Sequence, residues 1–167
     1  TAHFYDQFRL ERLHARAIGL DAGRAEVHLS HGGAPLSYDA LLVASGARAR
    51  APAFDGRHLR CVMTLRTLQD CRSVMERVGS GKLRHSTVVG GGPLGLEWAL
   101  GMHARGVRVT VLLRGTTFMA GALDAVASDL LAARLRQAGI EVLLRDEVQV
   151  ALDRGDGSVA AVRTKAG

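Results

Sequence analysis

The segment STVVGGGPLGLEW, residues 86–98, constrains the fold of this chain more than any other stretch, because four glycines separate an apolar strand-like run from a helix-like one. Residues 87–89 predict a short strand, and Pro93 favours the first turn of a helix that extends to about Arg105. A nearly continuous apolar run at 107–113 predicts a second, buried strand. Together these elements predict one βαβ unit with parallel strands.

The glycines of this segment have the spacing GxGxxG, formed by Gly90, Gly92 and Gly95. The first permits a tight turn, the second lets the backbone approach a pyrophosphate, and the third allows close packing of helix on strand. Free N–H groups and the helix dipole favour negative charge at the helix N-terminus. We predict a dinucleotide site, with a purely structural turn as the alternative. Its candidate cofactor-binding residues in this segment are Gly90, Gly91, Gly92, Pro93, Leu94 and Gly95.

The end of the second predicted strand bears on which dinucleotide is bound. NAD-specific sites place Asp or Glu there, about 20 residues beyond the glycines, to bind both ribose hydroxyls. Here that position is Leu113, which cannot do so. Arg114 follows directly and could pair with a 2′-phosphate. We therefore prefer NADP to NAD as the cofactor, with a solvated turn residue as the alternative role of Arg114.

The helix-strand pattern is repeated further along the chain. A second helix is expected at 124–138, with Gly139 at its C-terminal cap, and the strand IEVLL follows. One side of this helix is expected to carry the apolar residues Leu123, Val126, Leu130, Leu131 and Leu135. The turn sequence DRGDG then predicts a hairpin. The pattern indicates an α/β fold with an incomplete, parallel, Rossmann-type NAD(P)-binding sheet.

The first part of the chain indicates short strands instead. Residues 8–21 and 25–30 are separated by a turn and feed LSYDALLVASG, in which residues 40–44 predict a buried strand after a β-meander. Thr67, with Asp70 three positions later, predicts a capping box that opens a helix ending near Gly79. We place a domain boundary there, so that 1–79 form one segment and 80–167 the NAD(P)-binding domain.

Charge and cysteine usage restrict the other classes of function. The net charge of +6 comes from arginines scattered among acids, which is more typical of a solvated surface than of a nucleic-acid face. No apolar run is long enough to span a bilayer, no signal peptide is evident, and we expect a cytoplasmic origin without membrane partners. Cys61 and Cys71 form no metal-binding or redox motif, and Cys71 is expected to be a buried free thiol. No metal is expected.

Several segments in the same order resemble a known family. They are YDALLVASGARAR, VMTLRTLQDCRSV, VVGGGPLGLEWALGMHARGVRVTVLLRG and FMAGALDAVASDLLAARLRQAGIEVLL. Over nearly the whole chain these resemble the flavoproteins of the pyridine nucleotide-disulfide oxidoreductase superfamily. The VMTLRTLQD segment and the spacing from LLRG to FMAGALD are most similar to the flavoprotein part of NAD(P)H-nitrite reductase large subunits. Ferredoxin and rubredoxin reductases are close alternatives.

The resemblance implies further site residues. It places FAD against the strand YDALLVASG, where Ser45 stands in for the family's threonine, and makes Ser45, Gly46 and Arg50 FAD-side candidates. For Arg50, an ordinary loop residue is the alternative. Glu97 matches a position near the nicotinamide, although an acid also suits the start of a helix. Ala120 stands where many NADPH-using members carry a second arginine.

The resemblance also implies an activity, hydride transfer from NAD(P)H to FAD, for which the chain needs no catalytic acid or base. The family's N-terminal FAD fingerprint and its late Gly-Asp motif have no counterpart here, so we expect a fragment of a flavoenzyme that is inactive alone. The implied partners are the nicotinamide dinucleotide and an iron–sulfur or sirohaem electron acceptor, with a homodimer left open. A non-catalytic nucleotide-binding module is the rival class.

Overall fold

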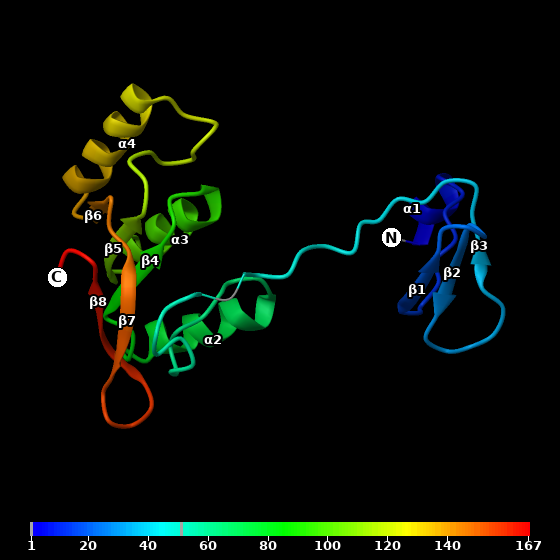
Figure 1. Cartoon of the computed structure of the whole chain (residues 1–167), viewed down its shortest axis with the longest axis horizontal. Helices are drawn as coiled ribbons and strands as arrows, with labels where there is room; N and C mark the ends of the chain where they lie inside the picture. Colours follow the sequence, from blue (N-terminus) through cyan, green and yellow to red (C-terminus); the bar gives the residue numbers. More distant parts are fainter. Residues whose placement is uncertain (1, 51) are drawn as a thin grey trace. The chain divides into compact units, whose positions relative to one another are not determined.

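The computed structural model describes residues 2–50 and 52–167. Contacts within the chain divide it into two compact units, Thr1–Ala47 and Arg48–Gly167 (Figure 1). The sequence boundary at Gly79 differs from this division, because helix α2, Leu68–Gly79, packs Val74 into the core of the second unit. The assignment of 1–79 to an FAD-binding segment is a separate matter and stays a prediction.

The first unit contains a three-stranded antiparallel meander after a short helix. Helix α1 spans Ala2–Gln7, and the strands are β1, Ala17–Asp21, β2, Glu26–Leu29, and β3, Leu36–Ser37, paired in that order. Asp21 shapes the first turn, since its carboxylate accepts the backbone N–H groups of the residues two and three positions later. The predicted meander is confirmed, but its first strand begins at Ala17 rather than Phe8.

Residues 40–44 do not form the buried strand that their composition predicts. The structure assigns them no strand, and Leu42 and Val43 expose 88% and 69% of their surface. An apolar segment is stabilised when another part of the protein buries it, but its own composition does not provide the surface against which it packs. Within the described part of the first unit, no strand pairs with this segment.

The second unit contains the predicted parallel sheet. Its strands are β4, His85–Val89, β5, Arg108–Leu113, and β6, Glu141–Leu144, in the order β4-β5-β6. The crossovers are helix α3, Pro93–His103, and helix α4, Ala125–Gln137 (Figure 1). The pairing of β4 with β5 and of β5 with β6 is parallel throughout. This arrangement confirms the α/β fold and the repeated strand-helix-strand pattern.

The core of this unit lies between the sheet and its helices. Alternate residues of β5 contribute Val109, Val111 and Leu113, all less than 5% exposed. The same cluster contains residues of all three helices: Val74, Ala99, Met102, Ala132 and Leu135. Helix α2 begins at the predicted capping box, in which Asp70 N–H donates to the Thr67 hydroxyl and Thr67 N–H to the Asp70 carboxylate.

Helix α4 buries part of the predicted side, since Leu135 is buried and Leu123 and Leu131 are half-buried against the core. Val126 and Leu130 are largely exposed, whereas Ser128, Ala132 and Leu135 are buried. Small residues let the helix approach the sheet closely, and a search for large apolar side chains misses such a face. The predicted cap is confirmed, since Gly139 has φ +89° and the N–H of Ile140 donates to Leu135 O.

A β-hairpin completes the chain, as the sequence predicts. Strands β7, Val148–Asp153, and β8, Val159–Thr164, are antiparallel, and Asp153 Oδ1 accepts the N–H groups of Gly155 and Gly157 in the turn between them. In residues 2–50 and 52–167, no helix has both the length and the apolarity that a membrane span requires.

Candidate functional site

The glycine-rich turn joins β4 to α3 with the geometry that its spacing predicts. Gly90 has φ +114°, a conformation that side chains disfavour, and its N–H donates to Leu112 O at 2.9 Å. The chain therefore leaves the sheet sharply one residue after β4 ends. Gly92 is the N-cap of α3, and its carbonyl accepts the first helical hydrogen bond, from Leu96 N–H.

The N-terminus of α3 differs from those of the other helices in the second unit. Helix α4 is capped by Asp124, whose carboxylate accepts Ala127 N–H at 2.7 Å, and α2 is capped by Thr67. No described side chain caps α3, because its N-cap is Gly92. A Cβ added at Gly92 would meet no atom within 4 Å. The N–H groups of the first turn of α3 thus have no side-chain acceptor, at the positive end of the helix dipole.

Two other glycines of the turn are needed for packing. A Cβ at Gly95 would overlap the carbonyl oxygen of Gly90 and contact Val88 Cγ1 at 3.5 Å. A Cβ at Gly91 would lie 2.8 Å from Leu113 Cγ and 3.0 Å from a Phe118 ring carbon. Gly95 therefore has its predicted packing role, and Gly91 gives room to the core below it.

An open groove of about 380 Å³ lies in front of this turn. Its lining residues come from the turn, the end of β5 and the loop after it: Gly90, Gly91, Gly92, Leu113, Arg114, Gly115, Thr117, Met119 and Ala120. The loop is pinned on both sides, since Met119 N–H donates to Gly91 O and Phe118 N–H to the buried Ser128 hydroxyl. An uncapped helix N-terminus beside an open groove is an arrangement that can hold a phosphate.

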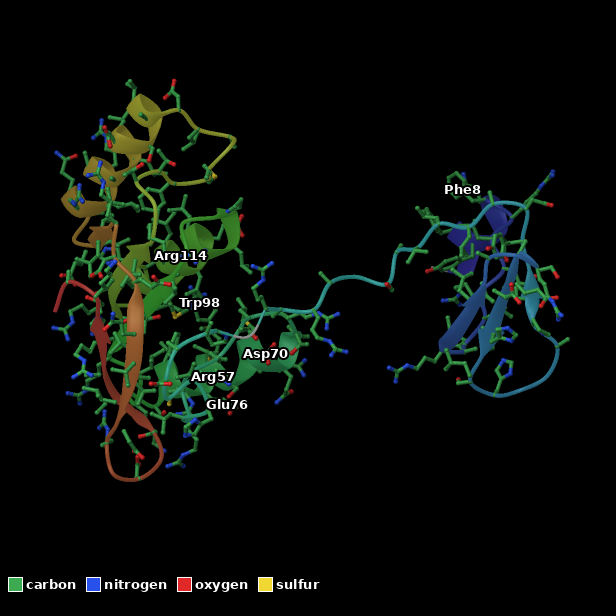
Figure 2. The ribbon with its side chains drawn as sticks, viewed as in Figure 1. Phe8, Arg57, Asp70, Glu76, Trp98 and Arg114 are labelled. Atoms are coloured by element: carbon green, nitrogen blue, oxygen red, sulfur yellow. The ribbon has the colours of Figure 1, made fainter. Side chains whose placement is uncertain are left out.

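Leu113 and Arg114 have opposite environments at the end of β5. Leu113 is 4% exposed and lies in the core, so it offers the groove only apolar surface. Arg114 is exposed (Figure 2). Its Nη1 lies 3.9 Å from Glu147 Oε1. The sequence did not identify Glu147, because β6 and the turn after it separate the two residues along the chain.

The turn after β6 is held firmly beside the groove. Arg145 has φ +58° and donates its N–H to Gly115 O at 3.0 Å, and Asp146 N–H donates to Leu113 O. The Asp146 carboxylate is buried and accepts the N–H groups of Glu147 and Ala166 at 2.8 and 3.1 Å. The Thr164 hydroxyl and these N–H groups hold the pKa of Asp146 below its usual value.

A polar chain crosses the sheet near the start of the strands. The Thr110 hydroxyl donates to Glu141 Oε2 at 2.7 Å and lies 2.8 Å from His85 Nε2, while Arg108 lies 3.2 Å from His85 Nδ1. Partial burial, and then the Arg108 charge, lower the pKa of His85. None of these four residues lines the groove, so we assign them to the structure of the sheet.

The remaining candidates are not gathered at the groove. Pro93, Leu94 and Glu97 are exposed on α3 and do not line it. Ser45 and Gly46 lie exposed in the first unit, where Ser45 borders an apolar groove of about 420 Å³ beside β1. Arg50 is exposed in the second unit. The roles of these six residues stay predictions.

The cysteines are both free. Cys71 is half-buried rather than buried, and Cys61 is exposed, with its sulfur accepting a hydrogen bond from Arg77 at 3.3 Å. Neither residue lines the groove. The structure thus gives the thiols no part in this site.

Comparison with known proteins finds oxidoreductases that are similar in sequence over most of this chain. A sequence model described as pyridine nucleotide-disulphide oxidoreductase matches residues 6–167. The chain is 32% identical over 155 residues to an NAD(P)H sulfur oxidoreductase (CoA-dependent) of Pyrococcus abyssi, covering 93% of this chain and 34% of that protein. It is 34% identical over 151 residues to the ferredoxin–NAD(+) reductase component of a biphenyl dioxygenase system of Paraburkholderia xenovorans, covering 90% and 36%.

A solved structure has the same fold. The ferredoxin reductase of a cytochrome P450 system from Rhodopseudomonas palustris superposes with a TM-score of 0.86 at 26% identity, covering all of this chain and 40% of that one. The chain spans about a third of the length of the two curated relatives.

Proposed function

The chain belongs to the pyridine nucleotide-disulphide oxidoreductase family, whose members use FAD and NAD(P)H, and on that premise we propose that its second unit binds the nicotinamide dinucleotide of a flavoenzyme. The observation that carries this proposal is the uncapped N-terminus of α3, which faces an open groove at Gly92. A helix end without a side-chain cap leaves donors for a pyrophosphate.

The cofactors supply the redox chemistry of this proposal, and the chain supplies the groups that bind and orient one of them. When bound, NAD(P)H supplies a hydride and FAD accepts it. The residues of this chain bind and orient the dinucleotide: the α3 N–H groups hold its pyrophosphate, and the loop after β5 borders its adenosine end. Hydride transfer of this kind needs position rather than a proton donor, and no residue of the groove is assigned a proton.

We further propose that NADPH is preferred to NADH. Leu113 presents no carboxylate to the ribose hydroxyls, and Arg114 stands exposed at the groove. A guanidinium forms charge-assisted hydrogen bonds with a phosphate. Ala120, which lines the groove in place of a second arginine, weighs against this preference.

Two classes of flavoenzyme, with different electron acceptors, are candidates for the parent of this chain. The VMTLRTLQD segment and the spacing from LLRG to FMAGALD support the flavoprotein part of a nitrite reductase large subunit. The ferredoxin reductases among the similar proteins support the second candidate, a ferredoxin or rubredoxin reductase. For both, we propose that 1–79 come from the FAD-binding part. Sirohaem-binding cysteines further along the open reading frame would favour the first candidate, and a short C-terminal interface domain the second.

Nucleotide titration of the chain tests the proposal. We expect NADPH to bind more tightly than NADH, with Arg114→Ala removing most of the difference by weakening NADPH alone. Calorimetry or the fluorescence of Trp98, the only tryptophan in the sequence, would follow binding. If neither nucleotide binds, the groove is not the site. If NADH binds more tightly, or Arg114→Ala leaves the ratio unchanged, the NADPH preference is wrong.

A further inference from the structure

We propose that Arg145 is a second specificity-determining residue, which together with Arg114 binds the 2′-phosphate of NADPH. This inference rests on the proposed function, because it assumes that the groove holds the adenosine end of a dinucleotide. The second positive charge would come from the residue after the neighbouring strand β6 and not from the loop after β5, where Ala120 stands.

The strand register brings the two arginines together. In the parallel pair β5–β6, Leu113 is the partner of Leu144, and each leucine is the last residue of its strand. Arg114 and Arg145 therefore follow at equivalent positions of adjacent strands, whose spacing is about 4.8 Å. The hydrogen bond from Arg145 N–H to Gly115 O, at 3.0 Å, extends the pairing beyond the strand ends. Both side chains thus start at the same edge of the sheet. Arg114 lines the groove, and Arg145, which does not line it, is bonded through its backbone to the lining residue Gly115.

The backbone at Arg145 is held in a conformation that arginine rarely adopts. Its φ is +58°, in the left-handed region, which costs a residue with a Cβ about 1 kcal/mol or more. Neighbouring hydrogen bonds to Gly115 and Leu113, and the buried Asp146 carboxylate, fix this turn. A rigid turn presents its side chain with little loss of backbone entropy on binding, which suits a recognition residue.

Two exposed arginine side chains, those of Arg114 and Arg145, are available to bind an anion at the ends of β5 and β6. Arg114 has a carboxylate neighbour, Glu147, at 3.9 Å. Arg145 is exposed, and in the described part of the chain its side chain takes part in none of the hydrogen bonds or ion pairs. The buried Asp146 carboxylate lies in the same turn, but it accepts the backbone N–H groups of Glu147 and Ala166 and pairs with neither arginine. A phosphate that bridges the two guanidinium groups would form charge-assisted hydrogen bonds with both.

The experiment compares two nucleotides that differ only in the 2′-phosphate. The chain and its variants would be titrated by calorimetry with adenosine 2′,5′-bisphosphate and with 5′-AMP. We expect the bisphosphate to bind the unaltered chain more tightly. Arg145→Gln should weaken bisphosphate binding by about five- to tenfold and leave 5′-AMP binding unchanged, because an exposed charge-assisted contact is lost. Arg145→Lys should recover most of the loss.

Controls separate this inference from the proposed function. Arg105 lies beyond the C-terminal end of α3, away from its uncapped N-terminus, and Arg105→Gln should change neither affinity. Arg145→Asn, which tolerates a positive φ, guards against a folding defect. If neither nucleotide binds the unaltered chain, the proposed function fails. If the bisphosphate binds more tightly and only Arg114→Ala reduces that advantage, the groove is right and Arg145 is not part of the site.

Discussion

Two alanine substitutions in the same turn should separate nucleotide binding from stability. At Gly92, a Cβ meets open space, and the backbone angles of −77° and 175° are allowed for alanine. At Gly95, a Cβ overlaps the carbonyl oxygen of Gly90. The two changes add the same methyl group three positions apart, and only the first adds it inside the groove.

The structure sets the expected size of the change in stability for each substitution. Replacing Gly95 in a helix would by itself gain about 1 kcal/mol. The overlap with a backbone carbonyl, which cannot rotate away, lies at the upper end of overpacking costs, about 3 kcal/mol. The net loss is therefore about 2 kcal/mol, or roughly 6 °C in melting temperature for a domain of this size. Gly92→Ala loses only the N-cap preference for glycine over alanine, below about 1 kcal/mol.

Thermal unfolding followed by circular dichroism measures the first effect, and titration with 5′-AMP the second. Gly92→Ala should keep a nearly unchanged melting temperature and weaken binding by roughly tenfold or more, which corresponds to about 1.4 kcal/mol. Gly95→Ala should melt earlier and, below its transition, bind with a smaller loss. Equal binding by Gly92→Ala and the unaltered chain would refute the assignment of the pyrophosphate to this helix end.

Two further predictions concern the turn after β6. Glu147→Gln should free Arg114 and strengthen binding of adenosine 2′,5′-bisphosphate by up to about fivefold, which corresponds to the free energy of an exposed ion pair. Asp129→Asn, which removes an exposed acid on α4, should leave this binding unchanged. Weaker binding of the bisphosphate by Glu147→Gln in calorimetry would contradict this prediction. Asp146→Asn should lower stability near neutral pH. Because the folded-state pKa of Asp146 is lowered, its contribution is complete above the unfolded-state pKa of about 3.9 and is lost as pH falls through the lower folded value. Urea midpoints of the two proteins should therefore converge in acid, and a constant difference at all pH values would show that ionisation of Asp146 is not involved.

The parts of the fold that the sequence predicted are those encoded by local pattern. Strand periodicity, the Thr67 capping box, Gly139 and the GxGxxG spacing each act within one turn or one strand, so their consequences follow from neighbouring residues. The hairpin at DRGDG is local in the same sense. These features located the βαβ unit and its glycine-rich turn before any tertiary contact was considered.

The misses arise where distant parts of the chain decide the outcome. Whether residues 40–44 are buried depends on a surface that covers them, and whether Val126 or Ser128 faces the sheet depends on how closely α4 approaches it. The pair Arg114–Glu147 and the contact of Arg145 with Gly115 depend on strand register. Register between β5 and β6 is not written in either strand alone, so the charged edge of the groove became visible only in three dimensions.

The burial of Leu113 narrows the routes by which cofactor preference could be changed. NAD-specific sites carry an Asp or Glu at this position, but here Leu113 fills the space that Gly91 leaves open and contacts the core. A carboxylate placed there would lose its hydration among apolar neighbours. A change of nucleotide preference among relatives of this chain should therefore involve the surface charges at positions 114, 145 and 147. Among natural relatives, positions 91 and 113 should vary together, with an acid at 113 accompanied by a changed loop around Phe118.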